Sequence, residues 1–106
     1  MVLQDGIMLA NRINIVEFAN TKGLPSVYQI REYPEAGGLM SYGLNYCQHF
    51  RRAAFYVDKV LKGVQPSELP VELPTTFELV INRKTAQRLD LAIPDRIVAV
   101  ADEVME

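Results

Sequence analysis

The chain has few residues of the kinds that build covalent or metal-held structure. One cysteine, Cys47, and one histidine, His49, occur among 106 residues, and there is no tryptophan. A single cysteine forms no disulfide within the chain, and the pair supplies too few thiolate and imidazole ligands for a structural zinc site. We therefore expect no metal and no other cofactor, and a fold that depends on its apolar core.

Excess positive charge and long apolar runs are also missing. Eleven Lys and Arg residues against thirteen Asp and Glu residues give a net charge of -2, which excludes the basic surface that a nucleic-acid backbone requires. No stretch approaches the roughly 20 apolar residues of a membrane span. Residues 1–6 lack the basic flank and apolar run of a secretory signal. The sequence as written therefore predicts a chain that stays in the cytoplasm and binds no nucleic acid.

The sequence offers little for catalysis. Any nucleophilic triad would have to use His49, and Cys47 is only two residues away, near the start of a predicted helix. Side chains at i and i+2 of a helix point in different directions, which disfavours a Cys-His pair. A hydrolase or transferase is the least supported class, and we expect a protein that is not an enzyme.

The residues that are present predict a single α/β domain over residues 1–106. Hydrophobic residues make up 49% of the chain, and helical and strand-like patterns alternate along it. Residues 31–38 fit no period and predict a loop, and the prolines of residues 64–76 predict an extended surface connector. The expected helices are residues 7–22, 45–63 and 83–89, the expected strands are 26–30, 39–42 and 77–81, and residues 97–104 fit neither period.

The best-defined helix begins after Asn45 and carries one apolar stripe. Asn45 is a suitable N-cap, with Gln48 three residues later, and Gly63 is placed to end the helix. The stripe consists of Phe50, Ala54, Val57 and Leu61, at i, i+4, i+7 and i+11. A stripe of this kind has to be buried against something.

Two stretches carry candidate binding residues. Arg31 and Glu32 follow a predicted strand, where α/β folds place ligand contacts, although a solvated surface ion pair explains them equally well. Ser41, Tyr42 and Asn45 bring a hydroxyl, a phenol and a helix N-terminus together after Gly37 and Gly38. An anionic group is one candidate ligand there, and a purely structural glycine turn is the other reading.

A series of segments in this order resembles the C-terminal portion of the ABC-transporter substrate-binding proteins of the periplasmic-binding type I class. The series spans nearly the whole chain and consists of Leu24-Pro25, residues 35–43, 51–54, 56–63, 69–72, 77–82, 84–86 and 101–104. The resemblance implies an α/β unit with a parallel sheet in three layers, corresponding to the last third of a two-lobed protein whose first lobe is missing. The sequence departs from the family pattern at residues 46–49, where an acidic residue is expected at position 48, so the ligand is undefined.

The resemblance also implies a function and a set of site residues. It implies a solute-binding component of an ABC-type uptake system, periplasmic, working with a membrane permease and binding a small amino-acid-like molecule. It places Ser41, Tyr42 and Asn45 near the cleft between the lobes, and Asp5, Arg31 and Glu32 on loops that face it.

The missing lobe leaves the stripe of Phe50, Ala54, Val57 and Leu61 without a cover. Burial of apolar surface is favourable by roughly 25 cal/mol per Å². We therefore expect a homodimer through this stripe. The alternative to a binding protein is an interaction or dimerisation module that keeps the same fold.

Overall fold

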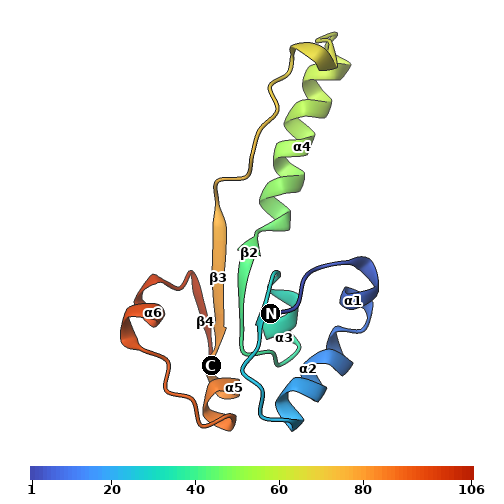
Figure 1. Cartoon of the computed structure of the whole chain (residues 1–106). Helices are drawn as coiled ribbons and strands as arrows, with labels where there is room; N and C mark the ends of the chain where they lie inside the picture. Colours follow the sequence, from blue (N-terminus) through green and yellow to red (C-terminus); the bar gives the residue numbers. More distant parts are fainter.

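The computed structural model describes all residues from Met1 to Glu106. Helices and strands alternate through most of the chain, as the sequence predicts (Figure 1). The helices are α1 (Gly6–Ala10), α2 (Arg12–Thr21), α3 (Glu32–Glu35), α4 (Tyr46–Leu61), the 3-10 turn η1 (Pro66–Glu68), α5 (Arg83–Arg88) and α6 (Asp95–Val100). The strands are β1 (Val27–Tyr28), β2 (Met40–Leu44), β3 (Phe77–Asn82) and β4 (Glu103–Met105).

The four strands form one mostly parallel sheet in the order β1-β2-β3-β4, which confirms the α/β class. The β1–β2 and β3–β4 pairs are parallel, and Val2 adds a parallel bridge to Tyr28. The central β2–β3 pair is antiparallel, with Tyr42 opposite Leu79. The chain leaves the sheet at the end of β2, runs out along α4 and returns directly into β3, so these two strands form a long hairpin. An entirely parallel sheet is therefore not observed.

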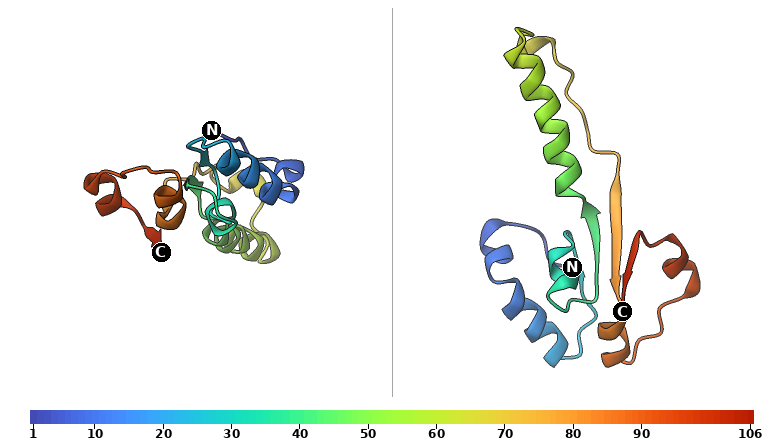
Figure 2. Two further views of the ribbon diagram at one scale, coloured as in Figure 1. Left: turned by 90° about the horizontal axis from the view of Figure 1, so that it is seen from below. Right: turned by 180° about the vertical axis from the view of Figure 1, so that it is seen from behind.

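The molecule divides into a body and an arm. The arm is residues 45–76, which comprise α4, η1 and the extended connector, and it projects from the sheet, while all other elements lie in the body (Figures 1 and 2). The radius of gyration is 17.2 Å, whereas a compact domain of this length has about 13 Å. No residue of α4 is buried. The arm therefore has no apolar partner within this chain.

The core lies in the body, where α2 and α3 pack on β1. It is centred on Val16, Tyr28, Ile30 and Tyr33. The rings of Tyr28 and Tyr33 are stacked, with centroids 4.4 Å apart and planes 9° from parallel. Since both rings are buried, this pair fixes the short helix α3 against the sheet.

Local sequence determines several of the element ends, and the predicted roles of Asn45 and Gly63 are confirmed. Asn45 caps α4 by accepting a hydrogen bond from the amide of Gln48, and Asn82 caps α5 through the amide of Thr85. Gly23 and Gly63 adopt positive φ angles of 65° and 98° just after α2 and α4. Glycine enters this left-handed region without a Cβ clash, which is why both helices end there.

The predicted helix over residues 7–22 is wrong in one respect, because it is interrupted at Asn11. Asn11 lies at the end of α1 and the start of α2, with φ -99° and ψ 15°. Its side-chain amide donates to the Ile7 carbonyl at 2.9 Å and so satisfies an acceptor of the last turn. Local side-chain bonding therefore ends α1 where the apolar period alone predicts continuation.

Two other segments also differ from the sequence prediction. The predicted loop over residues 31–38 contains α3, because Glu32 in a first helical turn is favourable and Pro34 is tolerated there. The segment 97–104, which fits neither period, contains both the end of α6 and the start of β4. No helix of the structure combines the length and the apolar character needed to cross a membrane.

Candidate functional site

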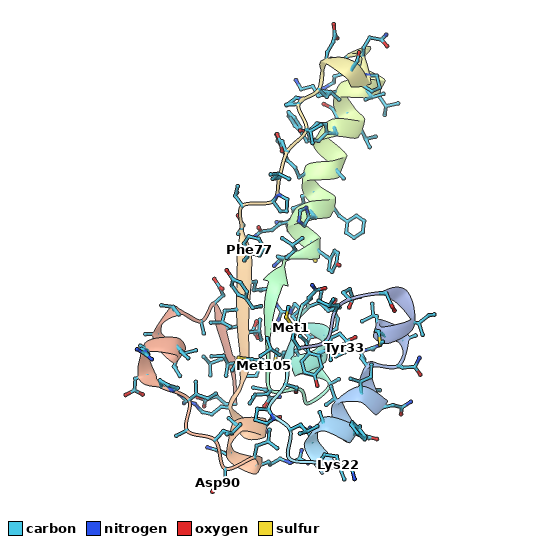
Figure 3. All side chains as sticks on the ribbon, in the orientation of Figure 1. Met1, Lys22, Tyr33, Phe77, Asp90 and Met105 are labelled. Atoms are coloured by element: carbon cyan, nitrogen blue, oxygen red, sulfur yellow. The ribbon has the colours of Figure 1, made fainter.

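The candidate residues gather at one edge of the sheet, where the arm leaves the body. Parallel strands end at the same edge, so the ends of β1 and β2 bring Arg31, Glu32, Tyr42 and Asn45 to it. Asp5 belongs to the same edge, because Val2 runs parallel to Tyr28. We call this region the site edge, and Phe77 marks its position at the start of β3 (Figure 3).

Arg31 is the electrostatic centre of the site edge. Its guanidinium contacts carboxylates from three elements: Glu35 at 2.9 Å, Glu78 at 3.1 Å and Glu103 at 2.7 Å. The hydrogen bond to Glu35, followed by that to Glu103, raises the pKa of Arg31 above its usual value. The cation is therefore permanent and ties α3, β3 and β4 together. Three carboxylates around one cation leave the cluster with negative charge in excess.

Tyr42 and Asn45 form the polar and aromatic part of the site edge. The Tyr42 ring is 55% exposed and stacks on Phe77, with centroids 5.6 Å apart and planes 23° from parallel. The two residues lie diagonally across the β2–β3 pair, at the reach of aromatic side chains. The Asn45 side chain is occupied by the helix cap. Since successive side chains of a strand point to opposite faces, this aromatic surface lies on the face of the sheet opposite to Glu78 and its partner Arg31.

The other predicted site residues are buried or already engaged in contacts within the chain. Ser41 is 2% exposed and sits within the sheet opposite Tyr28 and Val80, so it is not accessible from the site edge. Asp5 caps α1 by accepting from the amide of Met8 at 2.7 Å. Glu32 makes no ion pair, and its Oε2 is buried without a hydrogen-bond partner in the protein. The structure therefore brings Arg31, Glu32, Tyr42 and Asn45 to one edge of the sheet, with Tyr42 and Arg31 on opposite faces, and it buries Ser41.

The Gly37–Gly38 turn has a structural explanation. Gly37 has φ 102°, and its carbonyl accepts hydrogen bonds from Asn20 at 3.0 Å and Thr85 at 2.8 Å. A Cβ on Gly38 would lie 2.7 Å from the Tyr28 ring. Both glycines are thus required by backbone geometry and close packing, which favours the turn over an anion site.

A hollow with a volume of about 460 Å³ lies between α4 and the connector. Arg52 forms a two-bond ion pair with Glu72 across it, and Tyr56 donates to the Pro70 carbonyl at 2.8 Å. The bond to Arg52 lowers the pKa of Glu72 to about 2. These contacts fix the connector along α4. No group of three or more His, Cys, Asp or Glu side chains is arranged to hold a metal ion.

Sequence reasoning missed the residues that reach the site edge from the later strands. Phe77 and Glu78 begin β3, and Glu103 begins β4. Phe77 was recognised only as the first residue of a predicted strand. Strand pairing, which no local period reveals, places these residues beside Tyr42 and Arg31.

Comparisons with known proteins agree with this architecture. Residues 1–105 match the sequence model of the family described as ABC transporter substrate binding protein. No curated protein matches the chain. The chain belongs to the family of ABC transporter substrate-binding proteins. This family is non-enzymatic, in agreement with the expectation from the sequence.

Three solved structures resemble the chain. A conserved domain protein from Vibrio cholerae is 29% identical, with a TM-score of 0.89 over 96% of this chain and 34% of that protein. An ABC domain from Streptococcus pneumonia in complex with L-Trp is 27% identical, with a TM-score of 0.86 over 95% of this chain and 35% of that protein. A ligand-free, open substrate binding protein from Clostridium difficile shares the fold at 19% identity, with a TM-score of 0.67 over 98% and 35%. The chain thus spans about a third of each relative.

Proposed function

We propose that this chain is part of the solute-binding component of an ABC-type uptake system and that its ligand is a small amino-acid-like molecule with an aromatic side chain. The observation that carries this proposal is the L-Trp complex of a relative that superposes on 95% of this chain at a TM-score of 0.86. Such a component works in the periplasm and delivers its ligand to a membrane permease.

The chemistry of the site edge supports an aromatic amino acid. The exposed Tyr42 ring on Phe77 offers an aromatic surface on which a flat apolar side chain can stack. On the other face of the same edge, the excess negative charge around Arg31, together with the unpaired Glu32, suits an ammonium group. Asp5 and Asn45 add polar groups at the rim of the same edge, and Ser41 supports it from within the sheet.

Isothermal titration calorimetry tests this proposal with L-Trp, L-Phe, L-Tyr and L-Leu as probes. We expect heat of binding with the aromatic amino acids. In a thermal unfolding assay the same ligands should raise the melting temperature, because they bind the folded state. Tyr42→Ala should weaken binding by about tenfold or more, because stacking is lost. Phe18→Ala is the matched control, since Phe18 is a 62% exposed aromatic residue on α2. No binding of any probe, or equal binding by both variants, would contradict the proposal.

A second function rests on a different observation, the solvent-exposed apolar face of α4. We propose assembly of the chain as a homodimer through Phe50, Ala54, Val57 and Leu61, none of which is buried. A protein-interaction module would have this property without any ligand. Size-exclusion chromatography with light scattering tests it, with a dimer as the expected result and a monomer at all concentrations as the contrary one.

A further inference from the structure

Arg31 is the only cation of the chain that pairs with more than one carboxylate. Its Nε donates to Glu35 at 2.9 Å, its Nη1 donates to Glu78 at 3.1 Å, and its Nη2 donates to Glu103 at 2.7 Å. Every nitrogen of the guanidinium is therefore engaged by a residue of the body. None of these contacts involves the arm, so the network is complete within the sheet and α3.

These contacts make Arg31 unsuited to bind the carboxylate of a solute. Three carboxylates surround one guanidinium, so the cluster as a whole is negative and repels a further anion. The planar guanidinium also directs its N–H groups along fixed lines, and each nitrogen already faces an oxygen of the protein. Any effect of Arg31 on a solute must therefore act through other residues.

The network joins the start of α3 to the last two strands of the sheet. In the strand order β1-β2-β3-β4 the outermost strand is β4. The Arg31 side chain reaches from α3 to Glu78 on β3 and to Glu103 on β4 (Figure 1). The turn before β4 is fixed to β3 in addition, since the Leu79 amide donates to Asp102 at 2.7 Å. The first turn of α3 is thus held in place by two strands that follow it far along the chain.

Glu32 is the next residue, and its carboxylate is left without a partner. It is the first residue of α3, for which Arg31 is the N-cap. The Oε2 atom of Glu32 is buried and accepts no hydrogen bond within the protein. Arg31 does not neutralise this carboxylate, because its nitrogens are occupied by the three other acids. A buried acceptor of this kind gains most from a charged donor that a solute supplies.

We propose that Arg31 is a positioning residue of the solute site, which holds the first turn of α3 so that Glu32 accepts the ammonium group of an amino-acid ligand. This inference rests on the solute-binding function proposed above. It adds a role in solute recognition for Glu103 and, with it, for strand β4. Loss of one of these ties should weaken recognition of the ammonium group and leave the contacts of the aromatic ring unchanged.

Two probes, one with and one without an ammonium group, test this role. Isothermal titration calorimetry compares L-Trp with indolepropionate, which keeps the indole ring and the carboxylate and lacks the ammonium. The parent chain should bind L-Trp about tenfold more tightly than indolepropionate. Arg31→Met should weaken L-Trp binding about tenfold and change indolepropionate binding by less than about twofold. Glu32→Gln should show the same selective loss.

A milder variant and a matched control complete the experiment. Glu103→Gln keeps the shape of the side chain and removes its charge, so it should give a smaller loss of L-Trp binding, about threefold. This variant decides the outcome if circular dichroism shows that Arg31→Met does not fold. Arg83→Met is the control, because it breaks the 2.9 Å ion pair to Glu106 at the other end of β4. It should leave both affinities unchanged.

The outcomes separate this inference from the solute-binding function. Equal losses for both probes in the Arg31 and Glu103 variants would show a purely structural role and overturn the inference alone. Unchanged L-Trp binding in these variants would overturn it as well. Equal affinity of the parent chain for both probes would overturn the role of Glu32. No binding of either probe by the parent chain would instead overturn the solute-binding function and, with it, this inference.

Discussion

Gly43 is the residue at which the backbone of the site edge is most tightly constrained. A Cβ at this position would overlap the carbonyl oxygen of Gln29, which follows β1. No rotation of a side chain relieves this contact, because both atoms belong to backbone that the parallel β1–β2 pair holds in place. The close approach of these two strands therefore depends on a residue without a side chain.

Gly43→Ala should consequently destabilise the body. We expect a loss of about 3 kcal/mol in the free energy of unfolding, because β1 has to move away from β2. Urea denaturation followed by circular dichroism measures it. Gly6→Ala is the matched control, since a Cβ there meets nothing within 4 Å. Equal stability of the two variants would contradict the close approach.

Tyr33 carries a buried hydroxyl that has no hydrogen-bond partner in the protein. Burial raises the pKa of this phenol above its ordinary value of 10.0. The folded state then holds the Tyr33 proton more tightly than the unfolded state does. The contribution of the neutral phenol to the free energy of unfolding is therefore complete below pH 10, and it is lost as the pH rises through the pKa of the folded state.

Tyr33→Phe should therefore cost less than about 0.5 kcal/mol near pH 7, since no hydrogen bond is lost and the stacking on Tyr28 remains. Above pH 10 the variant should lose stability less steeply than the parent chain. Denaturation curves from pH 7 to 11 measure both effects, with Tyr42→Phe as a control that removes an exposed hydroxyl. A large loss at pH 7 would show that the hydroxyl has a stabilising partner.

At the scale of elements, the arm is held straight by contacts between α4 and the connector. The main one is the Arg52–Glu72 ion pair, and it is joined by the bond from Tyr56 to the Pro70 carbonyl. The depressed pKa of Glu72 means that its contribution is complete above about pH 4.5 and is lost as the pH falls toward 2. Since both side chains are exposed, the pair governs the position of the connector more than global stability.

Acid should therefore release the connector from α4 before the body unfolds. We expect the Glu72 carboxyl signal in carbon-detected NMR to titrate near pH 2, with the Tyr56 ring signals changing in parallel. Glu72→Gln removes the carboxylate and should show the released state already at pH 7. A midpoint near pH 4.5 for Glu72 would mean that the ion pair does not form in solution.

Sequence predicted those elements whose ends are set by neighbouring residues. Helix ends depend on contacts between residues a few positions apart, as at Asn45, Asn82, Gly23 and Gly63. For this reason α4 and α5 were located nearly correctly. The break at Asn11 was missed because the apolar period continues through it. Such a break depends on a competition between the asparagine side chain and the helix, which the period does not measure.

The site could be predicted only where the chain itself brings residues together. Tyr42 and Asn45 are close in sequence, and Arg31 and Glu35 are one helical turn apart. The partners Phe77, Glu78 and Glu103 arrive through strand pairing over long sequence distances, which a single sequence does not specify. For the same reason the sequence did not specify that the β2–β3 pair of the mostly parallel sheet is antiparallel.

At the scale of the whole molecule, the chain is a sheet-based body with one unsupported arm. Both features follow from its relation to the solved relatives, of which it spans about a third. The body provides the site edge, and no residue of α4 in the arm is buried. Solute binding at the site edge and assembly through α4 are the two proposals that follow from these parts.

Native mass spectrometry of the purified chain in the presence of L-Trp tests the proposed binding and the proposed assembly together. We expect a dimer of twice 12.0 kDa that carries the additional mass of the amino acid. The Val57→Glu chain in the same buffer should appear as a monomer. A bare monomer of the parent chain, unchanged by L-Trp at any concentration, would contradict both the assembly through α4 and the binding of a solute at the site edge.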